Sequence, residues 1–338
     1  MLLLRDDDIR AAASADGLLD DFQRLLARPG DGELILPNRI TIDAGRGAGW
    51  LRLMPAISHG VGYAGFKAMN FHPEVGVRYY ICLTSLADGE LVAMMDADWV
   101  TAYRTAATAA IAVRLLARPG AERVTVVGSG TQARALLQAT CEVMTPANVD
   151  VFSPTAANRD RFASEMGSEL GVPVTASGDL DASLRTADVV LSAHRAGGDP
   201  AIRGGIVAPG SLVCGISSVR PEQREVDVDV WRNSRVFVDD LEHVRESGDG
   251  RLAVVEGLAD DGDVLELWEV LRDPSRGRRS DDERLLFKSV GTAEQDIALA
   301  ALILERGQHL GLGETIGNFP AVRPIQSAPA PTPVPAGI

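Results

Sequence analysis

The sequence predicts an α/β fold that combines a doubly wound parallel sheet with a second, α+β domain. Three observations carry this prediction. Beyond residue 121, short β-branched runs alternate with helical stretches, the pattern of a parallel sheet with helices on both faces. Residues 34–91 instead show short apolar runs of period two that glycine interrupts, which is typical of an antiparallel sheet. The 338 residues also suffice for two domains that each bury their own core.

In the N-terminal part, capping residues and Pro-Gly breaks predict where each element begins and ends. Residues 6–26 predict one opening helix, because apolar side chains recur at helical spacing until a Pro-Gly break. Asp88 and Gly89 predict a hairpin turn. Thr101 is expected to cap an alanine-rich helix over 101–117, which ends at Arg118-Pro119-Gly120. We therefore predict a domain boundary at residue 118.

The elements of the C-terminal part are expected in alternation. Strands are predicted within 122–130, 148–154, 172–177, 188–194, 211–218 and 234–240, and helices within 131–144, 157–170 and 179–187. A polar, glycine-rich stretch then runs to Glu283. Residues 285–311 predict one long helix that packs back on the N-terminal domain, and the Pro/Ala-rich residues 327–338 predict a disordered tail.

Composition excludes several classes of protein. With 46% hydrophobic and 24% charged residues, the chain matches soluble globular proteins. A net charge of −14 opposes binding to nucleic acid or to anionic membranes. The three cysteines are widely spaced, the N-terminus lacks the basic region of a signal peptide, and no stretch has the length of a membrane helix, so a cytoplasmic protein is expected. The five histidines show no metal-ligand spacing, and no metal is predicted.

A glycine-rich loop joins the first predicted parallel strand to its helix. Gly128 permits a tight turn, Gly130 lets the backbone approach a pyrophosphate, and Ala133 fills the third small position. The helix that follows directs free N–H groups and a partial positive charge at the same place. The prediction is a nicotinamide dinucleotide on a Rossmann-type unit. The alternative is a glycine turn that only connects strand and helix.

The end of the next strand bears on the choice of dinucleotide. An Asp or Glu there usually binds the ribose hydroxyls of NAD. This chain instead has Ser153, Thr155 and Arg159, which favour the 2′-phosphate of NADP(H), although NAD remains an alternative. A solvated helix charge is the other interpretation of Arg159.

Three basic residues lie in unusually apolar surroundings: Arg52, Lys67 and Arg104. Arginine presents a planar fork to a carboxylate, and a lysine beside it can exchange a proton near neutral pH. Arg104 would follow the Thr101 cap within the first helical turn, where the helix dipole adds to the positive field. These residues are candidates for binding an anion. The alternative is that their stems only lie across apolar strands.

Together these residues resemble the ornithine cyclodeaminase/mu-crystallin family from about Arg52 to Gly313. The matching stretches are RLMPA at 52–56, RTAA at 104–107, GSGTQA at 128–133 and FKSVGTAEQD at 287–296. The resemblance implies a homodimer with a central Rossmann domain, 119–291. It also implies a substrate-binding and dimerisation domain in which residues 1–118 are completed by 292–326.

The resemblance also implies roles for individual residues. Arg52 and Lys67 would hold a substrate carboxylate, Lys67 would take part in proton transfer, and Arg104 would lie between substrate and cofactor. Thr131 and Gln132 would meet the pyrophosphate. The other expected cofactor-binding residues are Thr105, Ser218, Val219 and Ser289.

The family contains several activities, and one departure separates them. Cyclodeaminases carry an acid two places before the proline of a motif that reads here as residues 216–225, and this chain has Val219 there. Valine cannot orient or deprotonate an ammonium. We therefore expect a reductase or dehydrogenase at the C2–N bond of a small imino or amino acid, with the cyclodeaminase and an NADPH-dependent ligand-binding protein as alternatives. His194, where relatives carry small hydroxyl residues, is either a cofactor contact or an ordinary loop histidine.

Overall fold

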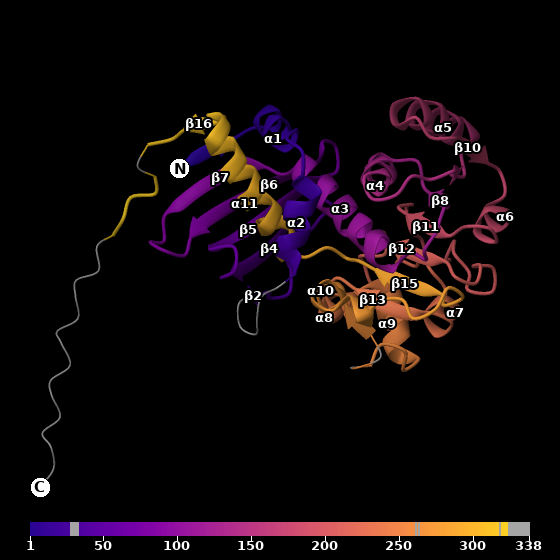
Figure 1. Cartoon of the computed structure of the whole chain (residues 1–338). Coiled ribbons are helices and arrows are strands. Elements are labelled where there is room, and N and C mark those ends of the chain that lie inside the picture. The colour runs from indigo at the N-terminus through magenta and orange to yellow at the C-terminus, as the bar shows by residue number, and fades with distance from the viewer. Residues whose placement is uncertain (28–33, 261, 263, 318, 324–338) are drawn as a thin grey trace, which may run out of the picture.

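Two sheets form the framework of the molecule (Figure 1). The computed structural model describes residues 1–27, 34–260, 262, 264–317 and 319–323. The expected disordered tail, 327–338, lies outside the described residues. Within them, no helix combines the length and apolar character needed to cross a bilayer.

The first sheet is mainly antiparallel, as predicted. Its strands are β1 (Leu2–Leu4), β2 (Leu34–Ile35), β3 (Ile40–Asp43), β4 (Trp50–Ser58), β5 (Tyr63–His72), β6 (Gly76–Ser85), β7 (Leu91–Asp96) and β16 (Glu314–Thr315). They run in the order β16-β1-β7-β6-β5-β4-β2, with β3 also paired to β4. Asp88 and Gly89 form the expected turn between β6 and β7, where Gly89 has a φ of 75°.

The C-terminal helix α11 (Ala293–Leu310) packs on this sheet against β4, β5 and β6. This helix thereby packs on the N-terminal part of the chain, as predicted (Figure 1). The predicted range 285–311 was wrong at its start, because β15 (Leu285–Lys288) is a strand of the other sheet. Fully buried Leu, Phe and Lys side chains in a short run satisfy either pattern, and only the strand pairing decides between them.

Two further predictions for the N-terminal helices were wrong. The opening segment forms α1 (Asp6–Ala13) and α2 (Leu18–Leu26), because Gly17 adopts a left-handed φ of 81° between them. The alanine-rich helix α3 (Asp98–Leu116) starts three residues before Thr101, after Ala97 as its N-cap. Thr101 is therefore an interior residue, and Arg104 lies beyond the first turn, where the helix dipole contributes little.

The second sheet is entirely parallel, in the order β10-β9-β8-β11-β12-β15-β13-β14. Its strands are β8 (Arg123–Val127), β9 (Asn148–Phe152), β10 (Val174–Ser177), β11 (Val189–Ser192), β12 (Leu212–Gly215), β13 (Arg235–Val238), β14 (Val264–Glu266) and β15. The first helices are α4 (Thr131–Cys141), α5 (Ala156–Leu170) and α6 (Leu180–Leu184). The order reverses between β8 and β11, and this confirms the doubly wound α/β fold and marks the edge where such sheets bind ligands.

The polar stretch before Glu283 holds more structure than its composition indicates. It contains α8 (Leu241–Glu246), α9 (Gly248–Val255), β14, α10 (Leu267–Arg272) and the 3-10 helix η1 (Pro274–Arg276), and α7 (Val228–Arg232) precedes it. These elements are short, and side chains at their N-termini, such as Asp240 and Ser247, accept backbone hydrogen bonds that fix them. Short capped elements of this kind leave little periodicity in a sequence.

Candidate active site

The glycine loop lies between β8 and α4, at the reversal of the strand order. Gly128 has a φ of 121°, and a Cβ there would collide with the carbonyl oxygen of Ala193, so the turn requires glycine. Gly130 is the N-cap of α4 with an ordinary φ of −85°, and a Cβ there would meet no protein atom within 4 Å. The first glycine is therefore needed by the protein itself, whereas the second keeps open space in front of the helix.

The start of α4 has the features of a dinucleotide site. Thr131 is exposed, and the buried Oε1 atom of Gln132 has no hydrogen-bond partner among the described residues. A buried amide oxygen without a partner is costly unless a ligand or water satisfies it. Ala133 is fully buried where helix and strand meet. These residues fit a pyrophosphate at the N-terminus of α4.

The residues expected near the adenosine ribose gather at the end of β9. Ser129 donates a hydrogen bond of 3.0 Å to the hydroxyl of Ser153, and Arg159 donates one of 2.9 Å to the Ser153 carbonyl. Thr155 is the exposed N-cap of α5. No carboxylate ends this strand, as the sequence already indicated.

A buried ion cluster joins β5, α3 and α11. The Nζ atom of Lys67 lies 2.8 Å from both carboxylate oxygens of Asp296, and Arg104 Nε donates to Asp296 at 3.0 Å. Arg104 Nη1 also donates to the side chain of Gln295 at 3.0 Å. Lys67 is 1% exposed and Asp296 0%, so water screens these interactions little. The structure thus brings together two of the three predicted cationic residues and supplies the carboxylate that holds them.

The electrostatic surroundings of Lys67 suit proton transfer. Burial, with the nearby charges of Arg104 and Arg39, lowers its pKa to about 7 despite the opposing effect of Asp296. A group with this pKa can both donate and accept a proton at neutral pH.

Arg52 lies apart from that cluster, at a cleft beside it. Its Nε donates to the hydroxyl of Thr41 at 2.9 Å, and its guanidinium lies 5.1 Å from the ring centre of Trp50. Cross-strand pairing of Met54 with Lys67 puts Arg52 and Lys67 on the same face of the sheet. Burial together with neighbouring Arg39 and Arg220 lowers the pKa of Arg52.

Arg39 was missed by the sequence reasoning, although it too lies among apolar residues. It donates to the carbonyl oxygens of Val290 and Gly291, at 3.4 and 3.1 Å, in the turn that leads into α11. A Cβ on Gly291 would collide with the Arg104 guanidinium, so glycine is needed for Arg104 to reach its partners. Asp239, at the end of β13, fixes the same turn by accepting from the backbone N–H groups of Val290 and Gly291. No periodic pattern would have identified Asp239.

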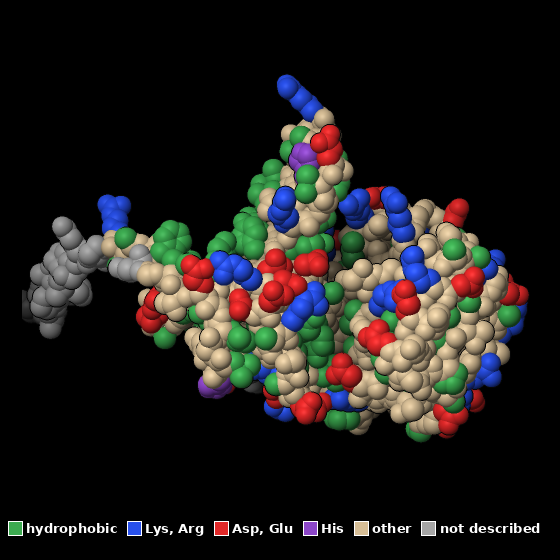
Figure 2. All heavy atoms as spheres, turned by 90° about the horizontal axis from the view of Figure 1, so that it is seen from above, with side chains coloured by type: hydrophobic (Ala, Val, Ile, Leu, Met, Phe, Trp, Pro, Cys, Tyr) green, Lys and Arg blue, Asp and Glu red, His purple; other side chains and the backbone are tan. Residues whose placement is uncertain are grey.

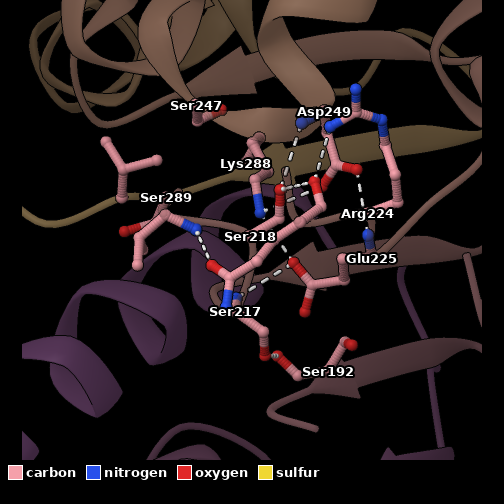
Figure 3. Close-up of polar contacts among 12 residues, drawn as sticks. Ser192, Ser217, Ser218, Arg224, Glu225, Ser247, Asp249, Lys288 and Ser289 are labelled. Atoms are coloured by element: carbon pink, nitrogen blue, oxygen red, sulfur yellow. Dashed lines mark hydrogen bonds and ion pairs between the residues drawn. The ribbon is translucent and has the colours of Figure 1, made fainter. Parts of the chain in front are cut away.

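A second buried ion cluster lies at the ends of β12 and β15 (Figure 3). Lys288 Nζ lies 2.6 Å from Glu225 and 3.4 Å from Asp249, and all three side chains are buried. Lys288 lowers the pKa of Glu225 against the effect of burial, whereas burial raises the pKa of Asp249. The cluster anchors the loop after β12, since Glu225 also accepts from the backbone N–H of Ser217.

His194 lies close to this second cluster. Its Nδ1 is 3.1 Å from the hydroxyl of Ser192, and burial lowers its pKa, so the ring is neutral at pH 7. Among the described residues, no group of histidines, cysteines and acids could hold a metal ion.

The remaining expected cofactor residues have their polar groups engaged by protein atoms. The Thr105 hydroxyl donates to the Thr101 carbonyl, and that of Ser289 donates to Asp239. Ser218 is buried, with its hydroxyl between the Gln223 carbonyl and the Asp249 N–H. Val219 lines the cleft at Arg52. The side chains of Thr105, Ser218 and Ser289 therefore stabilise the surrounding protein, because their hydroxyl groups donate to protein atoms.

The sequence of this chain is similar to those of characterised enzymes. This chain is 29% identical to an alanine dehydrogenase from Archaeoglobus fulgidus over 325 residues, and the match covers 94% of this chain and 98% of that protein. It is also 29% identical over 283 residues to the ketimine reductase mu-crystallin of Mus musculus, at 81% of this chain and 86% of the relative.

Solved structures are similar over almost their whole length. A Thermococcus litoralis Δ1-pyrroline-2-carboxylate reductase in complex with NADH and L-proline superposes with a TM-score of 0.86 at 28% identity, covering 94% of this chain and all of that one. An archaeal alanine dehydrogenase dimer with bound NAD also gives 0.86 at 28% identity, over 94% and 99% of the two chains. The family model for ornithine cyclodeaminase and mu-crystallin matches residues 2–310. This chain therefore belongs to the ornithine cyclodeaminase/mu-crystallin family.

Proposed function

We propose that this protein is an NAD(P)H-dependent oxidoreductase acting on the C2–N bond of a small imino or amino acid. The observation that carries the proposal is Lys67, a buried lysine with a pKa of about 7 that is held by Asp296 beside arginines able to bind a carboxylate. The relatives that reduce imines or oxidise amino acids support it.

The protein's own residues position the substrate and move a proton. When bound, a nicotinamide dinucleotide supplies or accepts the hydride. Arg52, with Arg39 beside it, binds the substrate carboxylate at the cleft. Arg104 stays fixed by Asp296 and Gln295 and adds positive charge behind that carboxylate. Lys67 gives a proton to the imine nitrogen during reduction and takes one back during oxidation.

For the dinucleotide, NADP(H) is proposed over NAD(H). Support comes from Arg159 and the hydroxyls of Ser153 and Thr155 at the end of β9, where a carboxylate is absent. The solved relatives contain NADH or NAD, so both cofactors need to be tested.

A homodimer built from the N-terminal domain is the proposed assembly, with residues 1–118 and 292–326 forming that domain and 119–291 the Rossmann domain. Support comes from the sheet face opposite α11. There Ile40 and Ile42 are 51% and 54% exposed, and register puts Leu51 and Leu53 beside them. A cytoplasmic location is proposed because Cys82, Cys141 and Cys214 are all unpaired thiols.

The experiment follows absorbance of NADPH and NADH separately, with Δ1-pyrroline-2-carboxylate and with mixtures of 2-oxo acids and ammonia. Consumption that requires the imine would support the proposal. Lys67→Met should reduce kcat by about 10²- to 10⁴-fold while cofactor binding, measured by NADPH fluorescence, is unchanged. Near-normal kcat in this variant would refute the role of Lys67. Ammonia released from ornithine, without consumption of cofactor, would instead identify a cyclodeaminase.

A further inference from the structure

The cleft at Arg52 has an unusual charge for this molecule. It encloses about 430 Å³ between β3 and β4 on one side and residues 219–221 and 243–251 on the other. Five arginines line it, namely Arg39, Arg52, Arg220, Arg245 and Arg251, against one acid, Glu246. The whole chain has a net charge of −14, and on the face shown in Figure 2 acidic and basic side chains are interspersed. So many arginines in one cleft of an acidic protein indicate an anionic ligand.

The arginines of the cleft differ in how far protein atoms already engage them. Arg245 donates to the Ala259 carbonyl, and Arg39 donates to backbone carbonyls near α11. Glu246, the acid, accepts from the side-chain amide of Asn38. Within the part of the chain that the structure describes, no side-chain hydrogen bond or ion pair engages the exposed guanidinium groups of Arg220 and Arg251.

Each arginine has five N–H groups, so two pairs of arginines in the cleft retain donors for a ligand. Arg52 and Arg39 lie on the side of Lys67, where the α-carboxylate is placed by the proposed function. Arg220 and Arg251 come instead from the loop after β12 and from α9, outside the antiparallel sheet that carries Arg52. A single carboxylate is satisfied by one or two arginines, which leaves the second group without a role.

We propose that the substrate carries a second carboxylate, which Arg220 and Arg251 bind, so that the reaction favours dicarboxylic imino acids. This inference rests on the proposed function and specifies its substrate class. A distal ammonium is disfavoured at the same place, because it would meet Arg220 and the apolar Val219, while the acid of the cleft, Glu246, already accepts a hydrogen bond from Asn38. A purely apolar side chain bound there would cover the exposed guanidinium groups of Arg220 and Arg251 without offering them a hydrogen-bond partner.

The test compares imines that differ only in the second charge. Ammonia is mixed with 2-oxoglutarate, with its 5-methyl ester, and with 2-oxovalerate, and the same comparison is made for oxaloacetate against 2-oxobutyrate. The variants are Arg220→Gln and Arg251→Gln. Arg185→Gln is the matched control, since Arg185 is an exposed arginine at the C-terminus of α6, outside the cleft.

For the wild type, kcat/KM should be roughly 10- to 100-fold higher with a diacid than with its neutral analogue, as expected for charge-assisted hydrogen bonds. Arg220→Gln and Arg251→Gln should each lower kcat/KM for the diacids toward the value for the monoacids and so remove most of this preference, while Arg185→Gln keeps the preference of the wild type. Equal reduction of diacids and monoacids by the wild type would overturn this inference and leave the proposed function intact. A decrease in kcat/KM for Arg220→Gln that is the same for diacids and monoacids would also overturn this inference. If no imine is reduced, the proposed function fails, and this inference fails with it.

Discussion

At the scale of single residues, the chemistry depends on how Lys67 is buried. Burial of a charged lysine is costly, so a lysine normally either lies in water or loses its charge when it is buried. Here Asp296 keeps the protonated form accessible while Arg104 and Arg39 oppose it, and the pKa settles near 7. Apolar sequence surroundings identified Lys67 and Arg104, but the opposing carboxylate lies 229 residues from Lys67 along the chain.

The pKa of Lys67 predicts opposite pH profiles for the two directions of the reaction. Lys67 is protonated below about pH 7, so imine reduction should be constant there and fall about tenfold per pH unit above it. Amino acid oxidation needs the neutral amine and should rise to a plateau above the same pH. Steady-state kcat measured against pH in both directions checks this.

Asp296→Asn provides the control for that assignment. The Asp296 carboxylate raises the pKa of Lys67, so its removal should shift the descending limb of reduction to lower pH, by about one unit or more. Circular dichroism establishes that the variant is folded. An unshifted limb in a folded variant would assign the titration to another group.

At the scale of elements, the turn from β8 to α4 separates what the fold requires from what a ligand requires. Gly128→Ala should lower the free energy of unfolding by at least about 1–3 kcal/mol, because alanine is strained at a φ of 121° and collides with Ala193. Gly130→Ala should leave the thermal midpoint of the free protein unchanged, since its Cβ meets open space. It should nevertheless weaken cofactor binding by about tenfold.

Thermal denaturation and fluorescence titration with NADPH measure the two effects in this pair. Equal destabilisation by both substitutions would show that the loop is merely a structural turn. Normal NADPH affinity in Gly130→Ala would place the pyrophosphate elsewhere.

Residues at the start of α5 are expected to discriminate between NADPH and NADH. Arg159 uses one N–H group for the Ser153 carbonyl and has further donors for a 2′-phosphate. Arg159→Ala should raise the KM for NADPH by roughly 10- to 100-fold and change that for NADH little. Arg161→Ala, an exposed arginine two residues away, is the control. Equal effects on both dinucleotides would contradict a role for Arg159 in phosphate recognition.

At the scale of the whole molecule, the face of the antiparallel sheet opposite α11 exposes apolar side chains to water, among them Ile40 and Ile42. Ile42→Lys adds a charge at a side chain that is 54% exposed in the single chain, so folding should be unaffected. In a dimer that forms through this face, the lysine would be buried without a partner. The dissociation constant of the dimer should therefore increase by about tenfold or more. Light scattering measures the mass of the particle. Val255→Lys, at an 80% exposed position on α9, should leave it unchanged.

The amino-acid sequence alone was enough to predict the parallel sheet, the antiparallel sheet and the glycine loop. Each of these depends on local signals: strand periodicity, the positive φ that only glycine adopts easily, and the small residue where α4 meets its strand. Local signals were less reliable at boundaries. The prediction has one helix across the break at Gly17, starts α3 at Thr101 instead of Asp98, and assigns the residues of β15 to a helix, because pairing and packing override weak preferences at the ends of elements.

The contacts of the cationic residues could not be predicted without the folded structure. Arg52, Lys67 and Arg104 were found from their apolar surroundings, but the contacts divide them between a buried cluster and an open cleft. Asp296, Asp239 and Arg220 come from a helix, a strand end and a loop that meet only when the chain has folded. The pKa of a group depends on charges within a few ångströms, whatever their distance along the chain, and that is a property of the fold.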